Sequence, residues 1–231
     1  MTHPPLALTL DLDDTLWPVW PAIARAEERL HAWLRTHARA TAARFDTAAL
    51  RALRDELAVR HPDWSHDLTR IRLESLRRAL CLAGDDPSLA EPAFAVFFQA
   101  RQEVELFDDV PPALERLAAR FPIVALTNGN AELDRIGLTP WFRDSVTARN
   151  FGVGKPDRRI FEEACRRLGV PPGRVLHVGD DAVLDVAGAL AAGLQAAWVV
   201  RPEIHPRPGP APTGTHHVVA SLAELADRLG A

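Results

Sequence analysis

The sequence predicts an α/β protein with a Rossmann-like parallel sheet and an inserted block of helices. Three observations support this fold class. A short apolar run near the amino terminus has the composition of a buried parallel strand. Residues 17–106 carry apolar residues at helical spacing and contain no convincing strand. From residue 107 onward, short apolar runs alternate with helical segments, which is typical of a parallel sheet.

The α/β core is expected to comprise residues 1–16 and 107–231. Its first strand is the run LALTLDL at residues 6–12. We expect the later strands at 123–126, 145–148, 175–178 and 196–200. We expect helices at 113–120, 157–168 and 182–192, with a last strand and helix within 217–229. The proline-rich segment 202–214 reads as a surface loop.

The inserted segment, residues 17–106, is expected to form a helical cap subdomain. Its helical segments are rich in Ala, Leu, Arg and Glu, and we place them at 22–38, 47–60 and 67–84. Because the insertion follows the first strand, we expect the cap beside the carboxyl edge of the sheet, where open α/β folds hold their ligands.

Charge and composition exclude several classes of function. The net charge of −4 gives no electrostatic reason to bind nucleic acid or an anionic membrane. No apolar run approaches the roughly 20 residues that span a bilayer, and the amino terminus has no signal-peptide pattern. Cys81 and Cys165 show no metal-ligand spacing. These features favour a reduced, cytoplasmic protein, and nothing demands more than a monomer or weak dimer.

Two aspartates, Asp11 and Asp13, stand at the end of the first predicted strand. They point the same way, because residues two apart on an extended chain share a face. Carboxylates held close together repel unless one is protonated or a cation lies between them. Mg²⁺ prefers such oxygen ligands together with substrate phosphate. The alternative is an acidic turn that caps the next helix.

Two further motifs offer donors for an anion. Thr127 and Asn128 follow the second predicted strand of the core, where a hydroxyl and an amide could meet a phosphate oxygen. A tight Asn-Gly turn is the alternative. Lys155 precedes a predicted helix and is the only lysine among 27 basic residues, which suggests that arginine does not serve there. It is not part of a P-loop, because Pro156 stands where Ser or Thr is required.

The fourth motif follows the predicted strand at 175–178. Its acidic residues are Asp180, Asp181 and Asp185. Asp180 is expected at the same edge of the sheet as Asp11, and Asp185 could orient a lysine or support a metal. The alternatives are a helix cap for Asp181 and a surface position for Asp185.

Together these motifs predict a site for phosphate and Mg²⁺. Three strand ends deliver carboxylates and neutral donors to one edge of the sheet, and a lysine lies nearby. Metal and lysine would stabilise an anion, and a carboxylate could attack it in line. The expected partner is a small phosphorylated metabolite.

The four motifs, in this order and spacing, resemble those of the haloacid-dehalogenase superfamily of hydrolases. The resemblance implies that Asp11 is the nucleophile and that Asp13 acts as general acid and then as base. It also implies that Thr127, Asn128 and Lys155 hold the phosphoryl group.

The same resemblance implies a Mg²⁺ site formed by Asp11, Asp180 and the backbone carbonyl of Asp13, with Asp185 and Asp181 in support. Phosphatases of the family have an acid two residues after the nucleophile, whereas its dehalogenases have no carboxylate there. The helical insertion is similar to the family's type-1 cap. These features favour a phosphatase.

Further runs, including HDLTRIRLESLRRAL and LTNGNAELDRIGL, resemble the flavin mononucleotide phosphatase branch, whose members act on riboflavin-pathway phosphates such as 5-amino-6-(5-phosphoribitylamino)uracil. Trp17 and Trp20 could stack on a flat ring. The alternative, which we favour, is that both pack the cap against the core.

Other functions stay open. Phosphoglycolate or nucleotide phosphatases and a phosphomutase of the same family would share all four motifs. A binding module that accepts a phosphoryl group with Mg²⁺ would not need Asp13 or a cap. The sequence assigns no role to the histidines His177, His205, His216 and His217.

Overall fold

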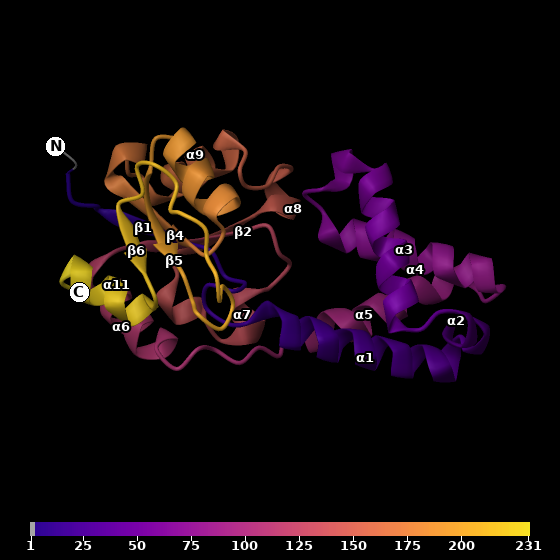
Figure 1. Ribbon diagram of the computed structural model, residues 1–231. Helices are drawn as coiled ribbons and strands as arrows, with labels where there is room; N and C mark the ends of the chain where they lie inside the picture. Colours follow the sequence, from indigo (N-terminus) through magenta and orange to yellow (C-terminus); the bar gives the residue numbers. More distant parts are fainter. Residues whose placement is uncertain (1–2) are drawn as a thin grey trace. The chain divides into compact units, whose positions relative to one another are not determined.

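The computed structural model describes residues 3–231, which divide into two compact units (Figure 1). The sheet unit extends to Pro18 and resumes at Glu105, and the helical unit spans Val19–Val104. Residues 17, 18, 105 and 106 therefore belong with the sheet, whereas the sequence boundaries place them with the helices. The reason is local: the Trp17 indole bonds to Asp13, and the Phe107 amide bonds to the carbonyl of Leu16.

The sheet confirms the predicted fold class. Six parallel strands lie in the order β3-β2-β1-β4-β5-β6. Their bounds are β1 Ala7–Leu10, β2 Ile123–Thr127, β3 Asp144–Thr147, β4 Val175–Gly179, β5 Gln195–Val199 and β6 His217–Val219. Because strand order reverses at β1, the loops that follow β1, β2 and β4 diverge at one carboxyl edge, which is where such sheets hold ligands.

The helices of the sheet unit flank the sheet on both faces (Figure 1). They are α6 Val110–Arg120, α7 Leu133–Ile136, α8 Ala148–Phe151, α9 Arg158–Leu168, α10 Gly188–Ala191 and α11 Leu222–Leu229. The predicted helix at 182–192 is divided: Ala182–Ala187 is π-helical and α10 completes it. The cause lies at Asp181, whose carbonyl accepts from the amides of both Asp185 and Val186.

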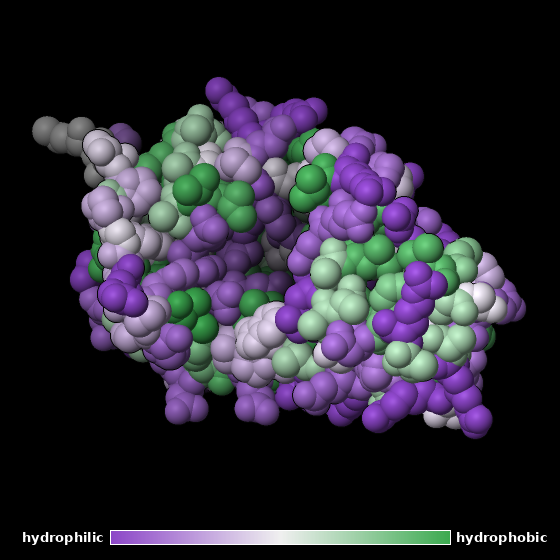
Figure 2. Space-filling model, turned by 45° about the vertical axis from the view of Figure 1, so that its right-hand side comes forward, coloured by the Kyte–Doolittle hydropathy of each residue, from purple (hydrophilic) through white to green (hydrophobic). Residues whose placement is uncertain are grey.

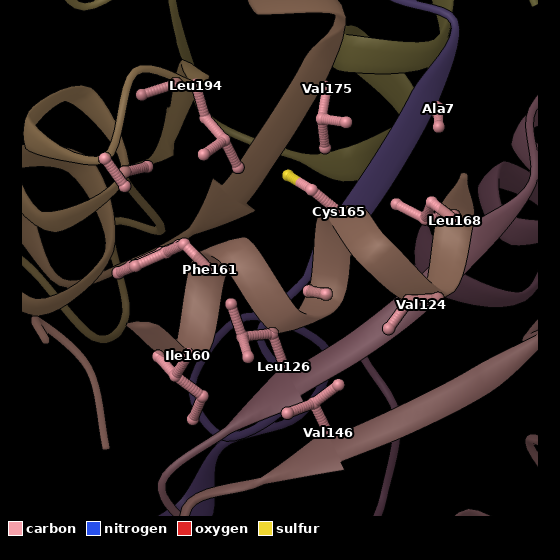
Figure 3. Close-up of a cluster of buried hydrophobic side chains, with 14 of the residues drawn as sticks. Ala7, Val124, Leu126, Val146, Ile160, Phe161, Cys165, Leu168, Val175 and Leu194 are labelled. Carbon is pink, nitrogen blue, oxygen red and sulfur yellow. The ribbon is translucent and has the colours of Figure 1, made fainter. Parts of the chain in front are cut away.

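An apolar core joins α9 to one face of the sheet (Figure 3). The apolar face of this helix contacts side chains of the strands. The helix contributes Ile160, Phe161, Ala164, Cys165 and Leu168, and the strands contribute Val124, Leu126, Val146 and Val175. β1, β2, β4 and β5 are buried along their whole length, as expected for central parallel strands covered on both faces.

Residues Val19–Val104, all of which are described, form helices and turns with no strand. The helices are α1 Val19–His37, α2 Arg39–Arg44, α3 Thr47–Arg60, α4 Leu68–Ala83 and α5 Ala90–Arg101. The sequence did not single out α2 or α5. Small and apolar residues of α1, α4 and α5 form its core, and apolar and hydrophilic side chains are interspersed on its surface (Figure 2). None of the described helices is long and apolar enough to cross a membrane.

A partly buried ion pair holds the two places where the chain leaves and re-enters the sheet unit. The Arg201 guanidinium donates to the carbonyl of Thr15 at 3.0 Å and to Asp109 at 2.8 and 3.3 Å. It also lies over the Phe107 ring, 3.8 Å from its centroid. Asp109 accepts in turn from the amide of Leu222 at the start of α11. One side chain therefore connects the segment after β1 with the segment before α6.

We expect the substitution Arg201→Met to lower the free energy of unfolding by about 3 kcal/mol, because it leaves Asp109 without its cation in a largely buried setting. Denaturant titration measures this change. The control Arg158→Met removes an exposed pair with Glu162 and should change stability by less than about 0.5 kcal/mol. Equal small effects of both variants would show that the Arg201 pair contributes little.

Candidate active site

The structure gathers charged side chains at the carboxyl edge of the sheet, all within the sheet unit. Asp11 follows β1 and Asp180 follows β4. Asp185 lies in the π-helical segment, and Lys155 lies in the loop before α9. All four are at least nine-tenths buried. The edge of a parallel sheet thus brings together residues that are more than 170 positions apart in the sequence.

Lys155 lies at the centre of this group. Its ammonium donates to Asp11 Oδ1 at 2.5 Å and to Asp185 Oδ1 at 2.6 Å. Burial alone would lower the pKa of Lys155, but the two carboxylates outweigh burial and raise that pKa above its usual range. The lysine is therefore a fixed cation, 6% exposed, at the bottom of the site.

The three carboxylates respond differently to their surroundings. Burial, together with the charges of Asp185 and Asp180, raises the pKa of Asp11 well above its usual range, although Lys155 opposes the shift. Burial and Asp185 raise the pKa of Asp180 to about 6. Burial also acts against the ionisation of Asp185, yet Lys155 and His177 hold its pKa below the usual range. Asp185 is therefore the anion that the protein itself neutralises.

The donor set fits a hard divalent cation. Asp11, Asp180 and Asp185 each offer an oxygen, and these atoms lie within 4.8 Å of one another. Their negative charge exceeds the single charge of Lys155, and burial together with the neighbouring carboxylates raises the pKa of Asp11 and Asp180. A divalent cation removes this excess. Asp185 already accepts from Lys155, His177 and the amide of Asp181, so Asp11 and Asp180 have more room for the ion.

Asp13 has a hydrogen-bond partner in Trp17. The indole Nε1 of Trp17 donates to Asp13 Oδ1 at 2.9 Å. Between them Asp14 takes a left-handed conformation with φ 58°, and its amide bonds to the Trp17 carbonyl. Trp17 is fully buried, so its ring offers no face for the predicted stacking on a substrate. The burial of Trp17 fits packing, the reading favoured from the sequence, and its indole also orients Asp13.

Asn128 contacts the loop that carries Lys155. Its Oδ1 accepts from the amide of Lys155 at 2.7 Å, and its Nδ2 donates to the carbonyl of Lys155 at 2.9 Å. A Cβ at Gly154 would lie 2.6 Å from Asn128 Oδ1, so only glycine allows this approach. The side chain thus positions the backbone of Lys155, and its contact with a phosphate stays a prediction. Thr127 is buried and its Oγ1 accepts from the Gly129 amide, which leaves its hydroxyl hydrogen for another acceptor.

The two other predicted site residues, Asp181 and Trp20, make contacts of their own. Asp181 caps the π-helical segment by accepting from the amides of Val183 and Leu184. Trp20 belongs to the helical unit, is 54% exposed, and lies 4.6 Å from the guanidinium carbon of Arg51. Its contact with a substrate stays a prediction.

The sequence reasoning missed three side chains at the site. Thr15 Oγ1 donates to Asp180 Oδ1 at 3.2 Å, and His205 Nε2 lies 3.0 Å from Asp180 Oδ2. His177 Nε2 lies 3.0 Å from Asp185 Oδ1. A signal existed for His177, because a histidine interrupts the buried apolar run of β4. Nothing in the proline-rich segment around His205 pointed to the site.

Comparison with known proteins identifies the family. The model of the haloacid dehalogenase-like hydrolases matches residues 6–193. The chain belongs to this family. The predicted membership is confirmed, and the protein is therefore an enzyme of the hydrolase class.

Several relatives of this hydrolase are phosphatases. It is 36% identical over 201 residues to the Escherichia coli 5-amino-6-(5-phospho-D-ribitylamino)uracil phosphatase YigB, which covers 85% of the chain and 84% of the relative. It is 35% identical to a Thermus thermophilus phosphoserine phosphatase, over 55% of each chain. It is 36% identical to the Escherichia coli pyrimidine 5'-nucleotidase YjjG, over 52% of this chain and 56% of the relative.

A solved structure agrees with the fold. The crystal structure of a 2-haloacid dehalogenase from Pseudomonas syringae superposes with a TM-score of 0.89 and 35% identity, covering 98% of each chain. The family's two chemistries, phosphate ester hydrolysis and dehalogenation, are therefore both represented among the similar proteins.

The raised pKa of Asp180 predicts a pH-dependent stability for the metal-free hydrolase. A group whose folded pKa, here about 6, exceeds the unfolded value of about 3.9 stabilises the fold at low pH and loses that contribution as pH rises through the folded pKa. We expect the melting temperature to fall between about pH 4 and about pH 6, and divalent cations to restore it.

The variant Asp180→Asn removes this titration and one ligand. It should weaken the pH dependence, because only Asp11 then keeps a raised pKa among these carboxylates, and it should reduce the shift produced by the cation, as followed by calorimetry. The control Asp63→Asn changes an exposed residue of the helical unit and should behave as the natural protein. A full cation shift in Asp180→Asn would argue against Asp180 as a ligand.

Proposed function

We propose that this hydrolase is a phosphatase that uses Mg²⁺ and cleaves a small phosphomonoester through an aspartyl-phosphate on Asp11. The observation that supports this most is the buried Asp11 carboxylate, fixed by Lys155 at the sheet edge with a separately oriented acid, Asp13, two residues later. The nucleophile and the acid thus both follow β1, and the first is held by Lys155 and the second by Trp17.

The first step transfers the phosphoryl group to the enzyme. The oxygen of Asp11 that does not accept from Lys155 attacks phosphorus, and the bond from phosphorus to the ester oxygen breaks. The electron pair stays on the leaving oxygen, and protonated Asp13 gives it a proton, so an alcohol departs. Mg²⁺ would neutralise charge on the phosphoryl oxygens, held by Asp11, Asp180 and the Asp13 carbonyl.

The second step releases phosphate. A water molecule attacks phosphorus, and Asp13, now ionised, accepts its proton. The bond between phosphorus and the Asp11 oxygen breaks, which returns Asp11 as a carboxylate and liberates inorganic phosphate. Lys155 and the Thr127 hydroxyl hold the anion in both steps, and Asn128 keeps the backbone of Lys155 in place.

For the substrate we propose a riboflavin-pathway phosphate, such as 5-amino-6-(5-phosphoribitylamino)uracil or flavin mononucleotide. The support is the similarity to YigB, which extends over 85% of the chain and so includes much of the helical unit. The phosphoserine phosphatase and the nucleotidase are comparable in identity but match only about half of the chain.

Dehalogenation is the second candidate, because the Pseudomonas syringae structure carries that name. Asp13 argues against it. A halide leaves as a stable anion and needs no proton, whereas the alkoxide of a phosphate ester does. A carboxyl group held two residues after the nucleophile by a buried tryptophan is therefore suited to phosphate esters.

We expect Mg²⁺-dependent phosphate release from a panel of phosphomonoesters, with the highest kcat/KM for the two riboflavin-pathway compounds. Asp11→Asn should abolish release, and Asp13→Asn should lower kcat by about a hundredfold or more. Phosphate assays on flavin mononucleotide, the ribitylaminouracil phosphate, phosphoglycolate, phosphoserine and nucleotides measure this. Chloride release from 2-chloropropionate with no phosphate release would establish the dehalogenase instead.

The hydrogen bond from Trp17 gives a separate prediction. Trp17→Phe keeps an aromatic ring in the core but removes the indole donor to Asp13, so kcat should fall about tenfold with little change in KM. Trp33→Phe, in the helical unit, is the matched control and should leave kcat unchanged. An unaltered kcat in Trp17→Phe would mean that the tryptophan only fills space.

A further inference from the structure

We propose that His177 is a positioning residue: it holds Asp185, and through Asp185 the ammonium of Lys155, while Thr9 holds the histidine ring. This deepens the phosphatase proposal by adding a buried relay behind the residue that binds the substrate anion. The inference rests on the proposed function for its kinetic consequence, whereas the geometry stands without it.

The relay is continuous. Thr9 Oγ1 lies 2.8 Å from His177 Nδ1, and His177 Nε2 lies 3.0 Å from Asp185 Oδ1. That oxygen accepts from Lys155, which also contacts Asp11. Thr9 and His177 are register partners on β1 and β4, so the parallel pairing itself brings them together. Thr9, His177 and Asp185 are each at most 1% exposed.

The direction of each hydrogen bond follows from charge. Asp185 Oδ1 accepts from the Lys155 ammonium and Oδ2 accepts from the Asp181 amide, so both oxygens of this side chain are acceptors. A carboxylate only accepts, so His177 Nε2 carries the hydrogen. In an imidazole that carries its hydrogen on Nε2, Nδ1 is the acceptor. Thr9 therefore donates its hydroxyl hydrogen to Nδ1, and both ring nitrogens are satisfied.

The surroundings of Asp185 and of the His177 ring restrict both side chains to few conformations. The second Asp185 oxygen accepts from the amide of Asp181 at 3.0 Å. A Cβ at Gly179 would lie 2.3 Å from Asp185 Cγ, so the backbone of β4 packs directly against the carboxylate. Phe161 meets the His177 ring edge-on, with centroids 5.2 Å apart. Removing the Nε2 donor takes away one of three hydrogen bonds that fix this carboxylate.

A purely structural histidine would be an unfavourable choice here. An apolar side chain would fill the same buried space without the desolvation of two polar nitrogens. Replacing Thr9 with valine and His177 with leucine preserves the apolar character of both strands. We therefore expect the double variant Thr9→Val with His177→Leu to fold as stably as the natural protein while its Lys155 is no longer fixed.

Lys155 is the only lysine in the chain, so its ammonium can be observed alone. Protein grown with ¹³C,¹⁵N-lysine should give one Cε–Nζ correlation, which reports Lys155 without any assay of activity. We expect this signal to shift or broaden in Thr9→Val with His177→Leu. His177→Gln keeps an amide donor toward Asp185 and should retain the natural signal. His216→Leu is the matched control, because His216 lies outside the relay.

The kinetic readout uses inorganic phosphate as the probe, with Mg²⁺ present. We expect its inhibition constant and the KM for substrate to rise about 10- to 100-fold in the double variant, and to recover in His177→Gln. Unchanged melting temperatures would separate positioning from loss of fold.

An unchanged lysine signal in the double variant would overturn the relay. A changed signal in a protein without phosphatase activity would support the relay and reject the proposed function. The two proposals therefore fail on different measurements.

Discussion

The site depends on one buried cation, the ammonium of Lys155, placed between the carboxylates of Asp11 and Asp185. A charge removed from water must be paired and hydrogen-bonded, and most of the surrounding structure meets that requirement. Asn128 holds the backbone of the lysine from β2, and Gly154 makes room for that amide. Without these contacts, three carboxylates at one sheet edge would repel one another with no fixed countercharge.

The sequence was informative wherever position along a strand determines position in space. Parallel strands end at a common edge, so the residues after β1, β2 and β4 could be placed together from their order in the chain. Lys155 stood out as a candidate site residue because it is the single lysine in an arginine-rich chain. In the structure its compact ammonium lies between two carboxylates, 2.5 and 2.6 Å away. Family membership followed from the same motifs.

What the sequence could not supply is the direction of each side chain. Asn128 turns to the backbone of a loop 27 residues later, and Trp17 turns back to Asp13, because tertiary contacts decide both rotamers. The role of His177 depends on its register partner Thr9, which lies 168 positions away in the sequence. The π-helical turn after Asp181 depends on the Asp181 carbonyl, which accepts from two amides. The spacing of apolar residues in the sequence does not indicate such a turn.

The pair of Arg201 with Asp109 has a consequence for how such proteins diversify. Its contacts with Thr15 and Phe107 fasten both junctions of the insertion from within the sheet unit. The sheet unit therefore fixes both junctions with its own side chains, and none of these contacts involves a residue of the segment Val19–Val104. In engineering terms, the two junctions form a natural graft point at which one insert can be exchanged for another.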